Sequence, residues 1–255
     1  DRWTLAGAVG SGAFAVYTVL RSVRARNPMH HVSSERLRWT YANQRPLGVL
    51  AVLSAIAGLM LLGPRLAQCW PVIMIAVLPA LLYLHPNAVD ERGGGLRALP
   101  GVKLFVILWC WTLATVVLPI QLAVDVNRGA AVFAHAMVHV PLYFAVAVLF
   151  DIRDLPTDPK SLRTVPQLIG LRWSRALAVL CLLFAGTLVL LRGLVSYTTF
   201  VDGEVPWDAI GASIGFLVAV AVAAGVSPTR TSGYFEFAVD GLLVLIPTLY
   251  FIGSM

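Results

Sequence analysis

Apolar residues in this chain occur in long, nearly uninterrupted runs. A run of about 18 or more apolar residues is long enough to cross a bilayer as a helix. Helix is the expected state, because backbone polar groups in lipid must be hydrogen-bonded within their own segment. The pattern predicts an all-α transmembrane bundle that forms a single domain over residues 1–255. Its eight predicted spans are residues 3–21, 47–64, 67–85, 102–124, 130–150, 173–195, 207–226 and 236–254.

The composition supports this class of protein. Hydrophobic residues make up 58% of the chain and charged residues only 13%. A soluble domain carries roughly 25% charged residues, so this chain has about half the charge that a water-facing surface needs. A soluble globular domain is therefore excluded, and an integral membrane protein is expected.

Basic residues are concentrated in alternate connections between the predicted spans. The segments 21–45, 86–103, 151–175 and 227–235 contain 15 of the 19 lysines and arginines. The positive-inside rule places these segments in the cytoplasm and both chain ends outside, in a plasma (inner) membrane protein. The net charge of +6 therefore reflects membrane topology. No basic recognition helix accompanies it, and no nucleic-acid partner is expected.

Three aspartates follow the fifth predicted span at closely related positions. Asp151, Asp154 and Asp158 have helical offsets of 0, 3 and 7, which places them within about 60° on one face of a helix. Such carboxylates repel one another unless a cation lies between them. Their hard oxygen atoms suit Mg²⁺, which typically combines one or two carboxylates with waters and substrate phosphates. The spacing predicts a magnesium site here.

Basic residues come soon after the three aspartates. Lys160 and Arg163 suit a diphosphate that a metal ion would bridge to the carboxylates. The alternative is a solvated loop in which the aspartates pair with Arg153, Lys160 and Arg163. The charges alone do not separate these two interpretations.

The pattern Asp151-x-x-Asp154-x-x-x-Asp158, followed by Lys160, Arg163-Thr164-Val165-Pro166 and Gly170, resembles the second aspartate motif of the UbiA-type membrane prenyltransferase superfamily. Arg45-Pro46-Leu47 and Leu99-Pro100-x-x-Lys103 resemble other family segments more loosely.

The resemblance implies a nine-helix fold whose first helix precedes this chain. It also implies an integral membrane transferase that moves a prenyl group from a polyprenyl diphosphate to an acceptor. Mg²⁺ would bind at the three aspartates, with membrane lipids around the fold. The residues expected to contact the diphosphate are Lys160, Arg163, Arg21, Arg24 and Arg45.

The sequence departs from this family at its first aspartate motif. The motif is expected near residues 17–26, where the chain has no carboxylate but has Arg21, Arg24 and Arg26. Arginine can neutralise a diphosphate but cannot coordinate a metal ion. An alternative is therefore a degenerate member that binds an isoprenoid, another lipid or a membrane partner without transfer, so enzymatic activity stays open. An unrelated transporter with charges along its pathway is a third hypothesis.

Overall fold

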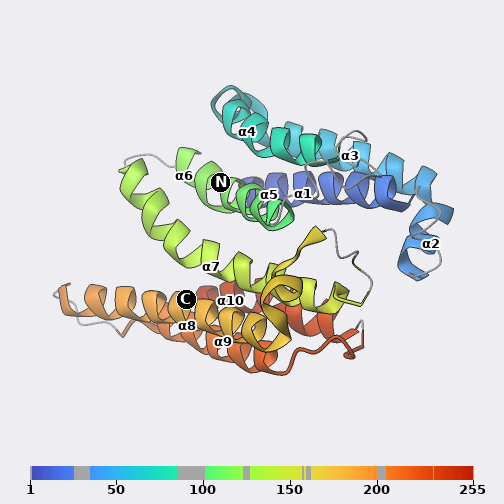
Figure 1. Ribbon diagram of the computed structural model, residues 1–255. Helices are drawn as coiled ribbons and strands as arrows, with labels where there is room; N and C mark the ends of the chain where they lie inside the picture. The colour runs from blue at the N-terminus through green and yellow to red at the C-terminus, as the bar shows by residue number, and fades with distance from the viewer. Residues whose placement is uncertain are drawn as a thin grey trace. The chain divides into compact units, whose positions relative to one another are not determined.

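The computed structural model describes residues 2–25, 35–84, 101–122, 127–156, 158, 162–199, 205–231 and 233–254. Within these ranges the chain forms helices and no strand (Figure 1). The predicted all-α class is therefore confirmed. The helices are α1 (Arg2–Ala25), α2 (Glu35–Ala42), α3 (Gln44–Leu62), η2 (Gly63–Arg65), α4 (Leu66–Leu84), α5 (Val102–Thr112), η5 (Leu113–Val117), α6 (Leu118–Leu122), α7 (Arg128–Asp154), α8 (Val165–Thr199), α9 (Trp207–Ala224), η7 (Tyr234–Val239) and α10 (Asp240–Gly253).

Six helices in the described part of the chain are long and apolar enough to cross a membrane. They indicate an integral membrane protein. The remaining two predicted spans, 3–21 and 67–85, also coincide with helices, namely α1 and α4. In α4 the apolar stretch, Leu66–Pro79, is shorter than the six candidate membrane spans. The six spanning helices are Gln44–Leu62, Val102–Leu122, Arg128–Asp154, Val165–Tyr197, Trp207–Ala224 and Tyr234–Gly253.

The chain divides into two compact units. Unit 1 comprises residues 1–84 and 113–126, and unit 2 comprises residues 85–112 and 127–255. In unit 1, α1 packs against α3, while α4 contacts η5 and α6. The α1–α3 contact depends on small residues: a Cβ on Gly58 would lie 3.2 Å from the carbonyl oxygen of Ala8. Such close approach of backbones is typical of helix packing in membranes.

Unit 2 contains the predicted aspartate motif. Its helices α7, α8, α9 and α10 pack each against the next, and α5 packs against α7 (Figure 1). The buried core of this unit includes Leu149 from α7, Leu182 from α8, Phe216 from α9 and Phe235 from η7. The α5–α7 contact brings the start of α5 to the end of α7.

Gly170 divides α8 into a short first segment and a long helix. Its φ of 81° and ψ of 163° belong to a region that essentially only glycine adopts. The Ser174 hydroxyl donates a hydrogen bond to the Gly170 carbonyl oxygen at 2.8 Å, immediately after the kink. Gly170 therefore lets the chain turn from the segment after the aspartates into the long helix.

Replacing Gly211 by alanine is expected to destabilise the protein. A Cβ at Gly211 of α9 would collide with the backbone carbonyl of Leu249 on α10, and backbone cannot move aside cheaply. Overpacking of this kind costs about 1–3 kcal/mol. Gly241→Ala is the matched control, because a Cβ there meets no atom within 4 Å. Thermal unfolding in detergent should show a lower melting temperature for Gly211→Ala only. Equal melting temperatures for the two variants would contradict the α9–α10 packing.

Candidate functional site

A single lysine bridges two of the predicted aspartates. The Lys103 Nζ donates to Asp151 Oδ1 at 2.7 Å and to Asp158 Oδ2 at 3.4 Å. The two carboxylates are almost fully enclosed, with side-chain exposures of 5% for Asp151 and 3% for Asp158. Lys103 lies in the first turn of α5 and retains 27% exposure. Because an enclosed carboxylate needs a cationic or hydrogen-bonding partner, the ammonium accounts for the stability of this pair.

Asp158 lies close to Asp151 because the chain makes one further turn after α7 ends. The backbone N–H of Asp158 donates to the carbonyl of Asp154 at 2.7 Å, which is a helical i+4 bond. Asp158 therefore lies two turns beyond Asp151, on the same side. The Gln167 side chain secures the following segment, since it donates to the Asp158 carbonyl at 3.3 Å and accepts from the Thr164 N–H at 3.1 Å.

Asp154 interacts with a different cation. The Arg153 guanidinium contacts it through two hydrogen bonds, of 2.7 Å from Nε to Oδ1 and 3.1 Å from a terminal nitrogen to Oδ2. The same guanidinium lies 4.6 Å from the Phe150 ring centroid and 5.8 Å from that of Phe235. Phe235 is fully buried within the π-helical turn η7. Cation–π contact and a bidentate pair together hold Arg153 and Asp154 in one arrangement.

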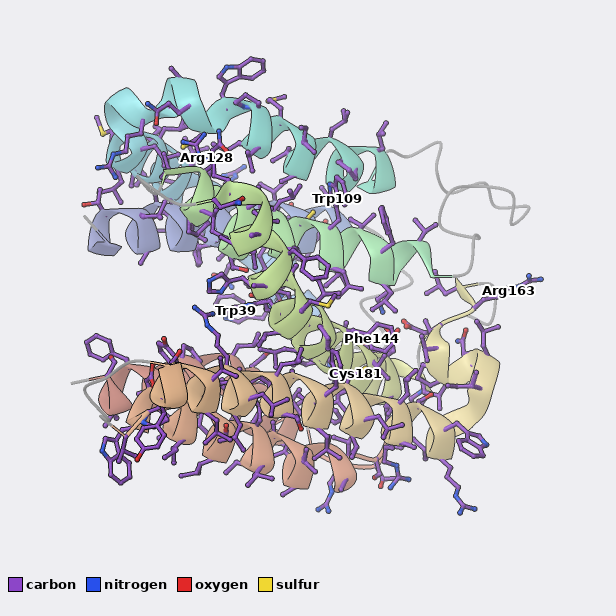
Figure 2. All side chains as sticks on the ribbon, turned by 90° about the vertical axis from the view of Figure 1, so that its left-hand side faces the viewer. Trp39, Trp109, Arg128, Phe144, Arg163 and Cys181 are labelled. Atoms are coloured by element: carbon purple, nitrogen blue, oxygen red, sulfur yellow. The ribbon has the colours of Figure 1, made fainter. Side chains whose placement is uncertain are left out.

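The segment after the aspartates carries an unusual backbone conformation. Arg163 has a φ of 45°, the one positive φ of a non-glycine residue among those described. A left-handed conformation costs an L-residue about 1–2 kcal/mol. The Arg163 side chain is exposed and points outward from the start of α8 (Figure 2). Thr164 beside it is only 5% exposed, and its hydroxyl has no hydrogen-bond partner within the described structure. Lys160 lies outside the described residues.

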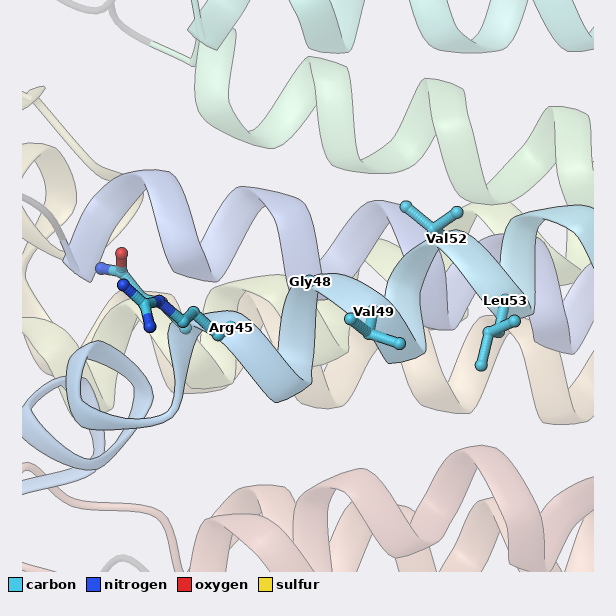
Figure 3. Close-up of a pocket in the computed structure, with 6 residues that line it drawn as sticks. Arg45, Gly48, Val49, Val52 and Leu53 are labelled. Atoms are coloured by element: carbon cyan, nitrogen blue, oxygen red, sulfur yellow. The ribbon is translucent and has the colours of Figure 1, made fainter.

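The other predicted diphosphate ligands belong to unit 1. Arg21 is half-buried on α1, and the Arg24 side chain lies outside the described structure. Arg45 is exposed in the first turn of α3, at one end of an open groove of about 490 Å³ (Figure 3). The groove runs along one face of α3. It is polar at the end where Arg45 lies and apolar along the rest of its length. Its lining residues are Gln44, Arg45, Gly48, Val49, Val52 and Leu53.

Lys103 was not among the ligand-binding residues predicted from the sequence. The residue type could have indicated a functional role for it, because the chain has only two lysines and Lys103 lies in the first turn of an otherwise apolar helix. Charged residues at the edge of a membrane span are candidates for function by default. The structure adds the partners of this lysine, Asp151 and Asp158, from segments 48 and 55 residues further along the chain.

The oxygen atoms of Asp151 and Asp158 are chemically suited to magnesium. Mg²⁺ is commonly held by one or two carboxylates, with waters and substrate phosphates completing its shell. The two carboxylates already converge on one cationic nitrogen, within 3.4 Å of it. A protein-only cage is not present in the described residues, which include no group of three His, Cys, Asp or Glu side chains arranged to hold a metal ion. A metal ion at Asp151 and Asp158 would therefore need further ligands, such as waters or phosphate oxygens.

Comparisons with known proteins do not assign this chain to a family: no family model, curated protein or solved structure matches it.

Lys103 and Asp151 are expected to be energetically coupled. Lys103→Met removes the cation that bridges the two enclosed carboxylates, whereas Asp151→Leu removes one of those carboxylates. Their combination should therefore cost less than the sum of the single changes, with a coupling of about 0.5–3 kcal/mol. Chemical unfolding of the four proteins in detergent measures this coupling.

Arg172→Met combined with Asp151→Leu is the matched control for that cycle. Arg172 is an exposed residue of α8, and it takes no part in the hydrogen bonds of the aspartates described above. The control pair should be additive. If the effects of Lys103→Met and Asp151→Leu on stability were also additive, the ion pair between these residues would be contradicted.

Proposed function

We propose that the protein is a UbiA-like integral membrane transferase that moves a prenyl group from a polyprenyl diphosphate to an acceptor. The observation that carries the proposal is the convergence of two enclosed carboxylates, Asp151 and Asp158, on one cation at the end of a long apolar helix. Enclosed carboxylates at the edge of a membrane span are costly and are retained where they serve a function. Their spacing is also the spacing of the family motif that they resemble.

The substrate class follows from the combination of apolar helices and charged helix ends. A prenyl chain is compatible with the apolar surface of the spanning helices, while its diphosphate stays at the charged end. Asp151 and Asp158 would hold Mg²⁺, and Lys103, Lys160 and Arg163 would neutralise phosphate oxygens. Asp154, which Arg153 positions, lies in the turn between these two aspartates. When bound, the metal would stabilise negative charge that develops on the departing diphosphate.

The proposed reaction is a substitution at the allylic carbon of the prenyl group. The bond between this carbon and the diphosphate oxygen breaks, and the diphosphate leaves with the electron pair. The nucleophilic atom of the acceptor forms a new bond to the same carbon and loses a proton to the surroundings. The cationic side chains stabilise the leaving group, where negative charge increases most in the transition state.

The same proposal includes the topology of the chain. With α1 and α4 added to the six apolar helices, the protein would have eight spans. The distribution of basic residues would then place the aspartate motif on the cytoplasmic side.

A second candidate function is isoprenoid or lipid binding without transfer. The observation that favours it is that each motif carboxylate already has a cationic partner within the protein: Lys103 for Asp151 and Asp158, and Arg153 for Asp154. A site neutralised in this way does not require a metal ion for stability. The absence of any carboxylate from residues 17–26 also favours this candidate.

Diphosphate release separates the two candidates. Purified protein in detergent is incubated with Mg²⁺ and prenyl diphosphates of several lengths, with an aromatic acceptor, and free diphosphate is measured. A transferase should release diphosphate, and Asp151→Asn or Asp158→Asn should slow release at least about 100-fold, because leaving-group stabilisation is lost. Asp208→Asn in α9, outside the motif, is the control and should retain the rate. Binding of a prenyl diphosphate without release under any condition would favour the second candidate.

A further inference from the structure

The Lys103 ammonium occupies the place between Asp151 and Asp158 that a shared metal ion would need. Its Nζ lies 2.7 Å and 3.4 Å from one oxygen of each carboxylate. Mg²⁺ requires its oxygen ligands at about 2.0–2.1 Å. An ammonium and a divalent cation cannot both lie between these two oxygens, since they overlap in space and repel each other. Metal binding at this pair therefore requires Lys103 to move.

The exposure of the three side chains indicates which of them can move. Asp151 and Asp158 are 5% and 3% exposed, whereas Lys103 is 27% exposed. The lysine is also unbranched and flexible, with its charge at the end of a four-carbon chain. The carboxylates are enclosed by the end of α7 and the turn that follows it. Lys103 can thus swing outward, while the aspartates stay in place.

A displaced ammonium needs a new anionic partner. Asp154 is the third carboxylate of the motif, but it already accepts two hydrogen bonds from Arg153. Arg153 is itself held against the Phe150 ring, at 4.6 Å from its centroid. The pair is therefore a poor acceptor for Lys103. A diphosphate supplies the missing anion, because lysine binds phosphate well as a compact charge.

We propose that Lys103 makes metal binding conditional on diphosphate binding: a divalent cation enters between Asp151 and Asp158 only when a diphosphate has taken over the Lys103 ammonium. The inference rests on the proposed function and concerns the regulation of the same site. Metal ion and diphosphate then bind with positive cooperativity, and each raises the affinity of the protein for the other by the same factor. We call this arrangement the lock. Without diphosphate, Lys103 neutralises Asp151 and Asp158, and no metal ion binds between them.

Equilibrium dialysis of the full chain in detergent tests this lock. Mn²⁺ is the metal probe and inorganic pyrophosphate is the anion, and the metal retained by the protein is measured with and without pyrophosphate. Wild-type protein should retain Mn²⁺ at least about 10-fold better when pyrophosphate is present, within the usual range of coupling between sites. Asp151→Asn/Asp158→Asn should abolish this retention and so locate the metal.

Two substitutions of Lys103 complete the experiment. Lys103→Gln removes the charge but keeps hydrogen-bond donors toward the carboxylates, so it should retain Mn²⁺ without pyrophosphate, at least about 10-fold better than wild type. Lys103→Arg keeps the charge and should behave as wild type. Thermal unfolding of each variant verifies that it is folded. The wild-type comparison with and without pyrophosphate tests the lock even if Lys103→Gln does not fold.

The outcomes separate this inference from the proposed function. If wild type and Lys103→Gln retain Mn²⁺ equally well without pyrophosphate, the lock is wrong and the metal–diphosphate site stands. If neither retains Mn²⁺ with or without pyrophosphate, both the lock and the proposed metal site are wrong. If the double aspartate variant retains as much Mn²⁺ as wild type, the metal binds elsewhere and the lock is likewise overturned.

Discussion

The ion pair network of Lys103 with Asp151 and Asp158 is the interaction on which the candidate site depends. It joins the first turn of α5 to the last turn of α7 and to the turn that follows α7. A carboxylate enclosed beside apolar helices is unfavourable unless a cation compensates its charge. The α5–α7 packing supplies that cation. The candidate site therefore depends on the packing of α5 against α7.

A second network connects the motif to the C-terminal helices. Arg153 pairs with Asp154 and lies against the rings of Phe150 and Phe235, the latter from η7. The Tyr234 hydroxyl next to Phe235 donates to the Val222 carbonyl at the end of α9, at 2.6 Å. Aromatic packing thus fixes one of the three motif aspartates in a fully paired state. In the proposed lock, Lys103 is the cation that changes partners.

The eight apolar runs were predictable as helices because the cause is local. A long apolar run can satisfy its backbone only within itself in lipid, so composition alone is informative. Of the three aspartates that the offsets place on one helical face, Asp151 and Asp158 contact the same lysine, whereas Asp154 pairs with Arg153. Pairing of the aspartates with Arg153 was one of the two interpretations of the sequence, since Arg153 is adjacent to Asp154.

What the sequence by itself determined is the class of the protein, the location of its long apolar helices and the position of its densest group of carboxylates. These depend on apolar run length and on helical spacing, which are properties of single segments. The tertiary structure decided which cation each carboxylate meets. Lys103 lies 48 residues before Asp151, and only the packing of α5 on α7 brings them within 2.7 Å. Pairing of charges across segments depends on distance in space, and spacing along the chain does not contain that information.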